Sequence, residues 1–458
     1  MVASVTTSSA LPTLGHEFAA LVRRHGVPGA QLAIHRAGRT VTTEVGELEY
    51  RTGQPVTADT AFGIGSITKS FTATAAMVLV EDGDLELDEA IGAYVPGMRE
   101  LGDELTLRCL LSHTAGLSSG PDPDEVSTIS VPRYVTEYCS RRRLVLPPGT
   151  GFSYSNIGYV LVGYVIEAVT GMSWAQAVAS IVLRPLGIQP AFLGAPGAEP
   201  PTRRIASGHS VNTALGRARP VFPLQAPTEA AAGALAMSAT DLVALGQVHL
   251  GAGVPELLPA RCAEQMRVPV AGAEPYGLAD AWGLGLAVFR EGTTAWVGHD
   301  GNADGTACYL RIDPVGGWVV ALTSNANTGA ALWKDILGEL ARAGVPIGRP
   351  RVEAPMRIPT VPPTGCAGLY VNGDVEYVVA EKEGRDLYLA VDGDGFARMT
   401  FYDHLTFTLQ DPESGREVLG GRFLRNPATK EIHALQVGGR LARRRGYTKR
   451  TNAGHFSA

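Results

Sequence analysis

The sequence has no excess of positive charge. Lysine and arginine together number 39 against 45 aspartates and glutamates in 458 residues, which gives a formal net charge of -6 and a pI near 6.0. Binding to nucleic acid or to an anionic membrane needs a basic surface, which this balance does not provide. The composition therefore argues against both partners.

Cysteine is scarce, and long apolar runs are missing. The five cysteines are widely scattered and show neither a CxxC pair nor metal-ligand spacing: Cys109, Cys139, Cys262, Cys308 and Cys366. No window approaches a transmembrane span, and the opening MVASVTTSSALPTLGHEF has neither the basic region nor the apolar core of a secretory signal. We therefore expect a reduced, cytoplasmic protein with no metal and no other cofactor.

The chain is longer than one hydrophobic core usually holds. Hydrophobic residues make up 45% and charged residues 18%, as in an ordinary globular enzyme, so two domains are expected. The proline-rich stretch PIGRPRVEAPMRIPTVPPTG reads as a stiff, extended connector. We predict a main domain of residues 1–350, a linker of residues 351–364, and a second domain of residues 365–458.

Segments that alternate as β-strands lie near both ends of the first domain, and segments with a helical pattern lie between them. GAQLAIHRAGRTVTTEVGELE alternates as a hairpin around Ala37 and Gly38, while FTATAAMVLVEDG is too apolar for a surface helix. Ser238 and Asp241 fit a helix-capping pair. These patterns predict an α/β (α+β) fold: one mixed sheet whose terminal strands meet, carrying a helical region.

The second domain has a different pattern. Alternating segments follow one another with turn signals every eight to twelve residues, roughly as in an antiparallel meander. We expect these strands to close into a small antiparallel β-barrel.

Ser66 and Lys69 are three residues apart at the start of the apolar helix, so their side chains share one face. A buried, neutral lysine can take the serine proton, and lowering its pKa from about 10.4 toward 7 costs roughly 4 to 5 kcal/mol, which requires a desolvated site. The helix N-terminus favours negative charge on the serine oxygen. The alternative is a chance S-x-x-K with a capping serine and a solvated lysine.

Two further segments carry polar side chains suited to catalysis. In PGTGFSYSNIGYV, Tyr154 can shuttle a proton and Asn156 can hold a substrate carbonyl or the lysine; otherwise Tyr154 is a packed aromatic and Asn156 an N-cap. In GHDGNADG, Gly301 allows close approach of the backbone beside His299, and the N–H of Asn302 can join that of Ser66 as an oxyanion hole. The alternative there is a glycine-rich turn with an exposed histidine.

S-x-x-K, Y-x-N and H-x-G in this order resemble the serine β-lactamase and penicillin-binding-protein superfamily, in its class C-like branch with D-aminopeptidases and carboxylesterases. LRCLLSHTAGL, LPPGTGFSYSNIGYVLVGYVIEAVTG and AAAGALAMSATDLVAL look like framing segments of that branch. The resemblance covers roughly residues 15–345, and it implies a β-lactamase/transpeptidase-like fold.

The resemblance also implies roles for the motif residues. Ser66 becomes the acylated nucleophile, Lys69 its base, Tyr154 the proton shuttle, and Asn156 the residue that orients the substrate amide. His299 replaces the lysine of the usual K-T-G motif, so a permanent charge becomes a weaker, titratable donor. Dedicated penicillin hydrolysis is therefore not expected.

Three other polar residues have weaker signals. Glu229 in PTEAAAGAL can face the cleft and receive an amine, or it is a solvated loop carboxylate. Arg444 in GGRLARRRGY can bind a substrate carboxylate through both arms of its guanidinium. The alternative is that this arginine run is a solvent-exposed strand end, as such runs usually are. His113 in LLSHTAGL is expected to be a structural histidine that hydrogen-bonds its own turn.

The appended barrel, the H-D-G histidine and the missing export signal resemble the standalone penicillin-binding-protein-type thioesterases, which carry a lipocalin-like module. That likeness implies an enzyme that takes a nonribosomal peptidyl thioester, with a carrier-protein domain as a possible partner. It would release the peptide by head-to-tail macrocyclisation and favour a D-residue at the C-terminus. The alternatives are a D-stereospecific peptidase, amidase or esterase of the same family, and a non-catalytic peptide or acyl sensor.

Overall fold

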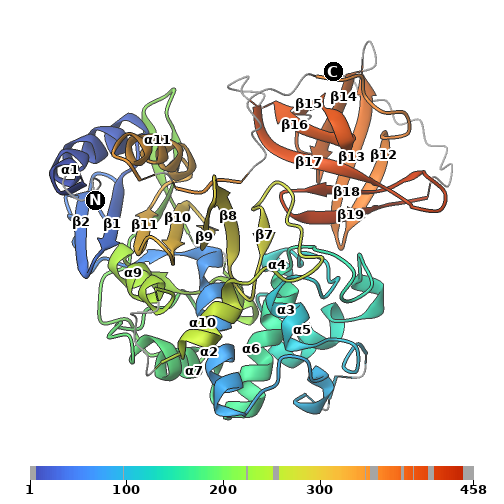
Figure 1. Cartoon of the computed structure of the whole chain (residues 1–458), viewed down its shortest axis with the longest axis horizontal. Helices are drawn as coiled ribbons and strands as arrows, with labels where there is room; N and C mark the ends of the chain where they lie inside the picture. The colour runs from blue at the N-terminus through green and yellow to red at the C-terminus, as the bar shows by residue number, and fades with distance from the viewer. Residues whose placement is uncertain are drawn as a thin grey trace. The chain divides into compact units, whose positions relative to one another are not determined.

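The computed structural model describes residues 7–95, 97–98, 100–222, 225–250, 257–345, 347–350, 359–382, 386–395, 397–410 and 417–446. The chain forms two compact units (Figure 1). The first comprises Met1–Pro275 and Ala279–Arg351, and the second Tyr276–Leu278 and Val352–Ala458. Of the predicted linker, 351–364, residues 351–358 lie outside the described part of the chain.

A seven-stranded antiparallel sheet is the centre of the first unit. Its strand order is β2 (Arg39–Gly46), β1 (Gly29–Arg36), β11 (Trp318–Ser324), β10 (Thr306–Asp313), β9 (Thr294–Ala303), β8 (Ala287–Glu291) and β7 (Ala281–Trp282). The hairpin predicted around Ala37 and Gly38 joins β1 to β2, and both turn residues have positive φ. Because β1 pairs with β11, the N- and C-terminal strands of the unit meet as predicted.

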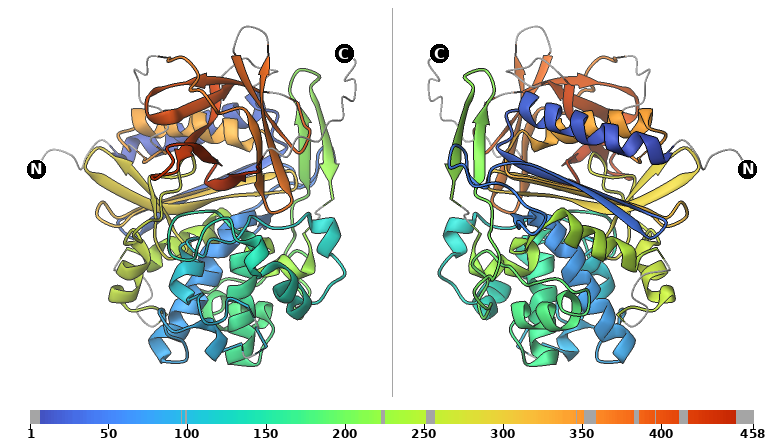
Figure 2. Two further views of the ribbon diagram at one scale, coloured as in Figure 1. Left: turned by 90° about the vertical axis from the view of Figure 1, so that its right-hand side faces the viewer. Right: turned by 90° about the vertical axis from the view of Figure 1, so that its left-hand side faces the viewer.

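Helices cover both faces of this sheet (Figure 2). Two of them, α1 (Thr7–Arg24) and α11 (Gly329–Arg342), pack together on one face. On the other face, α9 (Ala239–Val248) lies against β1 and β11. The helical region around α2 is on this same side of the sheet (Figure 2). Helix α9 begins with the predicted capping pair, since the Ser238 hydroxyl accepts from the Asp241 backbone and the Asp241 carboxylate accepts from Ser238.

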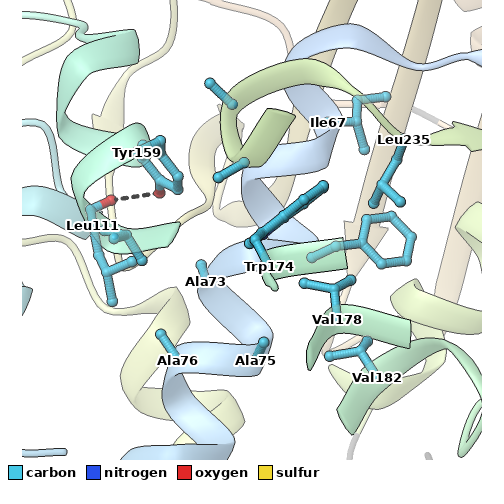
Figure 3. Packing of buried hydrophobic residues seen from close by; sticks show 14 of the residues in the cluster. Ile67, Ala73, Ala75, Ala76, Leu111, Tyr159, Trp174, Val178, Val182 and Leu235 are labelled. Carbon is cyan, nitrogen blue, oxygen red and sulfur yellow. Dashed lines mark hydrogen bonds between the residues drawn. The ribbon is translucent and has the colours of Figure 1, made fainter. Parts of the chain in front are cut away.

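Helix α2 (Thr68–Asp82) runs through the middle of the helical region and is buried on nearly all sides. Its small side chains, among them Ala73 and Ala76, let Trp174 and other apolar residues pack closely against it (Figure 3). The helix ends at Gly83, whose φ of 83 is the left-handed conformation that glycine adopts readily. The prediction of a buried central helix is confirmed.

The other described elements of the first unit surround α2 and the sheet. The helices are α3 (Leu107–Leu111), α4 (Pro123–Val126), α5 (Val131–Tyr138), α6 (Asn156–Thr170), α7 (Trp174–Val178), α8 (Ala230–Gly233) and α10 (Ala260–Arg267), with a π-helical turn at Ala179–Leu183. Two small antiparallel pairs are formed by β3 (Phe62–Gly63) with β6 (Ala236–Met237), and by β4 (Gly208–Asn212) with β5 (Arg217–Val221).

The second unit is a closed antiparallel barrel, as the sequence pattern predicts. Its strands, in order, are β12 (Gly368–Asn372), β13 (Val375–Lys382), β14 (Asp386–Val391), β15 (Ala397–Phe401), β16 (Thr406–Gln410), β17 (Glu417–Arg425), β18 (Ile432–Val437) and β19 (Arg440–Arg444). Alternate side chains point inward. Tyr370, Phe401, Phe407 and Phe423 pack together in a buried cluster there.

All five cysteines are free and buried. Among the described helices, none alone has the length and hydropathy to cross a membrane; Asn156–Thr170 and Trp174–Leu183 meet that test only as a pair bent by 78°.

Candidate active site

Ser66 lies at the mouth of α2, in the short 3₁₀ turn Gly65–Ile67 that precedes the helix. The S-x-x-K spacing predicts that Ser66 and Lys69 share one helix, which is wrong for Ser66, because the regular α-helix begins at Thr68. The backbone N–H of Ile64 donates to the carbonyl of Leu235, which fixes the entry of the chain into the turn. The serine is partly exposed, whereas its neighbours are buried.

Strand β9 passes directly against this turn. A Cβ on Gly65 would overlap the carbonyl oxygen of Asn302, and a Cβ on Gly301 would overlap that of Ile64. Gly65 also has a φ of 49, a conformation unfavourable for other residues. The close approach predicted for Gly301 is therefore present, and the backbone of Asn302 lies beside that of Ser66. An oxyanion hole made by their two N–H groups stays a prediction.

Lys69 is only 1% exposed, and its side chain reaches back to the serine. Its Nζ donates to Ser66 Oγ at 3.0 Å and to the carbonyl oxygen of Ala232 at 2.7 Å. Both of these oxygens are neutral acceptors, and the buried carboxyl of Glu229 interacts electrostatically with the same amine. The alternative of a solvated lysine is wrong.

Tyr154 is buried next to the lysine. Its ring centre lies 5.2 Å from Lys69 Nζ and 4.2 Å from the ring centre of His113. His113 accepts a hydrogen bond from the backbone N–H of Ser155 at Nδ1, at 3.2 Å. His113 thus has a structural role, as expected, and the hydrogen bond supports the segment that carries Tyr154.

Asn156 begins helix α6, but it is not the N-cap. Ser155 takes that position, and its hydroxyl accepts from the backbone N–H of Gly158. The side-chain oxygen Oδ1 of Asn156 is buried and has no hydrogen-bond partner in the described part of the chain. The capping alternative is thus wrong, and this acceptor is available to a ligand.

Glu229 is 5% exposed, which contradicts the alternative of a solvated carboxylate. Its Oε1 accepts from the hydroxyl of Tyr134 at 2.9 Å. Burial raises the pKa of the carboxyl, although the Tyr134 hydrogen bond and the charge of Lys69 act in the opposite direction. A Cβ built on Gly120 would lie 3.4 Å from Glu229 Oε1 and 3.6 Å from Asn156 Cβ, so both residues line one small region.

His299 lies on β9 and is 3% exposed, so it is not the exposed histidine of a turn. Its Nδ1–H donates to the carbonyl oxygen of Asp300 at 2.6 Å, which leaves Nε2 with a lone pair. Nε2 is buried, and no partner for it is found among the residues described. Burial, followed by the charge of Lys69, lowers the pKa of His299 to about 3. The expected titratable donor is instead a neutral acceptor at Nε2.

Aromatic rings enclose His299. The ring centre of Trp282 on β7 lies 5.2 Å away, edge to face, and that of Tyr154 lies 6.2 Å away. Trp282, Tyr134 and the carbonyl of Ala232 did not emerge from sequence reasoning. The AAAGAL segment was noted, but a backbone acceptor leaves no signal in a sequence.

Arg444 belongs to the second unit, so it is not assigned to this site. Its guanidinium donates to the carbonyl oxygens of Ala367 at 2.8 Å and Ile432 at 3.3 Å. A role in binding a substrate carboxylate stays a prediction. Within the described ranges, no group of three or more His, Cys, Asp or Glu residues is placed to hold a metal ion.

The arrangement can perform nucleophilic acyl transfer. A hydroxyl at a helix N-terminus touches a buried amine, a phenol lies beside them, and backbone N–H groups stand nearby. Comparison with known families agrees, because the beta-lactamase family model matches residues 15–343. The protein belongs to the beta-lactamase family.

Individual relatives in this family extend the comparison. Penicillin-binding protein 4 of Amycolatopsis lactamdurans is 32% identical over 344 residues, which is 72% of this chain and 90% of that protein. The crystal structure of SurE matches with a TM-score of 0.84 and 40% identity, over 95% of this chain and 99% of that chain. SurE with D-Leu matches at 0.82 and 39%, over 95% and 100%.

The fold and part of the sequence are also shared with a smaller relative. A D-stereospecific amidohydrolase from Streptomyces sp. matches with a TM-score of 0.57 and 26% identity, over 70% of this chain and 97% of that chain. The chain is thus a serine hydrolase of the beta-lactamase and penicillin-binding-protein group, with a barrel added after the catalytic domain.

Proposed function

We propose that this beta-lactamase family member takes a peptidyl thioester, holds the peptide as an ester on Ser66, and releases it by head-to-tail cyclisation. In this scheme a nonribosomal peptide arrives on a carrier-protein domain. The peptide's own N-terminal amine is the second acceptor, and a D-residue at its C-terminus is preferred.

The chemistry divides into two acyl transfers. In the first, Ser66 Oγ attacks the thioester carbonyl, Lys69 takes the hydroxyl proton, and the C–S bond breaks as Tyr154 returns a proton to the leaving thiolate. In the second, the amine attacks the ester carbonyl and loses a proton to the Tyr154 phenolate. The ester C–O bond then breaks, and Lys69 returns its proton to the Ser66 oxygen. The N–H groups of Ser66 and Asn302 would stabilise the oxyanion in both steps, and each such donor is worth about 3 kcal/mol.

The observation that carries this proposal is the set of acceptors around the serine. Asn156 Oδ1 and His299 Nε2 are buried acceptors without partners among the described residues, and the Glu229 carboxyl lies close to Asn156. Buried acceptors require donors. A peptide N–H and an incoming amine supply donors.

Two comparisons support the preference for a D-residue. SurE has been solved with D-Leu, and its likeness extends over 95% of this chain, including the barrel. The Streptomyces amidohydrolase is D-stereospecific by its printed description. That second likeness also favours the alternative function, a D-stereospecific amidase or peptidase in which water is the second acceptor.

A product assay separates these functions. Purified protein is given a linear peptide thioester of a small thiol, with D- or L-leucine at the C-terminus, and the products are weighed by mass spectrometry. Cyclic amide from the D-substrate supports the proposal, whereas linear acid alone supports the hydrolase. If neither a product nor a covalent adduct on Ser66 is formed, the result would indicate the non-catalytic sensor.

A matched substrate sharpens the assay. Acetylating the peptide N-terminus removes the intramolecular nucleophile but leaves the thioester unchanged. Thiol release should continue at a similar initial rate, while the cyclic product disappears and linear acid replaces it. If cyclic product persisted with the blocked substrate, the N-terminal amine would not be the acceptor.

A further inference from the structure

An ion pair between a buried guanidinium and a partly exposed carboxylate lies on the opposite side of β9 from the candidate site. Successive side chains of a strand point to opposite faces of the sheet. His299 faces Tyr154 and Trp282, whereas Asp300 faces the side covered by α11, where it pairs with Arg311 of β10.

Burying the charged side chain of Arg311 at that position costs desolvation free energy. Its side chain is 2% exposed, and its guanidinium lies 3.7 Å above the ring centre of Phe289 and 5.7 Å from that of Trp333. The Nε atom is buried without a hydrogen-bond partner in the described residues. A buried ion pair is weak evidence for stability, since apolar side chains of similar size often serve as well. Its presence calls for another explanation.

The ion pair connects directly to the backbone that holds His299. Arg311 donates to the Asp300 carboxylate and, at 3.0 Å, to the carbonyl of Leu310, the residue paired with His299 across the two strands. The carbonyl of Asp300 in turn accepts from His299 Nδ1–H. Arg311 therefore ties the Asp300 side chain to the β10 backbone opposite His299, which restrains the direction of the Asp300 carbonyl.

That carbonyl decides which nitrogen of His299 carries the proton. A carbonyl oxygen can only accept, so its position beside Nδ1 requires the Nδ1–H tautomer and leaves Nε2 as an acceptor. If the Asp300 peptide were to turn, Nδ1 would lose its acceptor. Nε2–H would then compete, and it would present a donor to the incoming amine.

We propose that Arg311 and Asp300 are positioning residues, which hold His299 from the far face of the sheet in the tautomer that accepts a hydrogen from the attacking amine. The amine's role rests on the proposed function above. The tautomer does not, so the two ideas can fail separately.

The test uses the whole chain of 458 residues labelled with ¹⁵N-histidine. The His299 signals are identified by their loss in His299→Gln, and their ring ¹⁵N shifts report which nitrogen is protonated. Arg311→Met keeps an apolar side chain against Phe289 but removes the donors, while Arg311→Lys keeps the charge. Arg203→Met is the matched control, because Arg203 also has a buried guanidinium that pairs with an aspartate, Asp241, and its Nε likewise finds no partner among the described residues.

We expect Nδ1–H in the wild type and a mixture of tautomers in Arg311→Met. In the peptide thioester assay, this variant should release thiol within about threefold of the wild-type rate, while its ratio of cyclic to linear product falls at least tenfold. Arg311→Lys should recover part of that ratio, and Arg203→Met should change neither readout.

Two results would overturn the proposal. One is an unchanged Nδ1–H tautomer in Arg311→Met. The other is an equal loss of thiol release in Arg311→Met and Arg203→Met, which would indicate a structural role only. If Arg311→Met does not fold, the double variant Arg311→Met with Asp300→Asn removes both charges and is measured in its place. Should the wild type form no cyclic product, the proposed function fails while the tautomer readout still tests the positioning.

Discussion

The side-chain nitrogen of Lys69 lies 3.0 Å from the hydroxyl oxygen of Ser66, with the Ala232 carbonyl 2.7 Å from the same nitrogen. This contact joins a buried amine to a partly exposed hydroxyl at the start of a buried helix. The amine is held by a backbone carbonyl, and the hydroxyl remains open to substrate. Acyl transfer through Ser66 follows from this relationship.

Lys69→Arg should remove acylation while the protein stays folded. A guanidinium keeps its proton in proteins, so it cannot act as the base, and general-base catalysis contributes about 10²- to 10⁴-fold. We expect the rate of thiol release to fall by about 10³-fold. Lys334→Arg, at an exposed position of α11, is the matched control and should leave that rate unchanged. Wild-type turnover in Lys69→Arg would show that another group takes the serine proton.

Gly65→Ala should disturb the turn that carries Ser66. The new methyl group would overlap the Asn302 carbonyl in addition to straining a φ of 49. We expect the unfolding free energy to fall by roughly 1 to 3 kcal/mol. The rate of thiol release should fall by about 10²-fold, because the Asn302 backbone of β9 must move away from the turn that carries Ser66. Gly83→Ala provides the control. Gly83 also has a positive φ, but a Cβ built on it would have no described atom within 4 Å beyond its immediate chain neighbours. Its activity should be preserved, and equal losses in both variants would attribute the effect to backbone strain alone.

Much of this site was predictable because its signals are local. Ser66 and Lys69 are three residues apart, so one helical turn brings their side chains together even though Ser66 lies in the 3₁₀ turn before the helix, and the barrel follows from alternation along each strand. The choice of Ser155 rather than Asn156 as N-cap was not predictable, since both residue types cap well. The same holds for the partner of His113 and for the tautomer of His299. Both depend on burial and on a carbonyl placed by the fold.

Tyr134→Phe tests whether the hydrogen bond from Tyr134 prepares the Glu229 carboxyl to bind the attacking amine of the peptide. The substitution removes the hydroxyl that donates to the buried carboxyl, and an unsatisfied buried acceptor costs about 1 to 3 kcal/mol. The pKa of Glu229, which burial already raises, should rise further, because the hydrogen bond from Tyr134 lowers it. We expect the ratio of cyclic to linear product to fall severalfold. Tyr138→Phe, at a neighbouring buried tyrosine, is the comparison, and equal effects would exclude a specific role.

His299 should make the first unit less stable in acid. Its pKa is about 3 when folded against an ordinary value of 6.5, so below pH 6.5 the unfolded chain binds a proton that the folded protein does not. Stability that is present above pH 6.5 is therefore lost as the pH falls toward 3, by up to about 1.4 kcal/mol per pH unit. His299→Gln should show a shallower loss between pH 6 and 4.5.

Urea titrations followed by tryptophan fluorescence measure this effect. All 5 tryptophans lie in the first unit, so the signal reports that unit's unfolding. His249, whose pKa burial lowers to about 4, contributes equally in wild type and variant. Parallel pH slopes in the two proteins would show that His299 is not held neutral by the fold.

The central claim is the ester on Ser66, and intact-protein mass spectrometry tests it directly. After rapid mixing with a peptide thioester, the wild type should gain the mass of the peptide acyl group, and digestion should locate that mass on the fragment containing Ser66. Ser66→Ala should gain no mass and release no thiol. Turnover by Ser66→Ala, or an adduct on any other residue, would contradict the account.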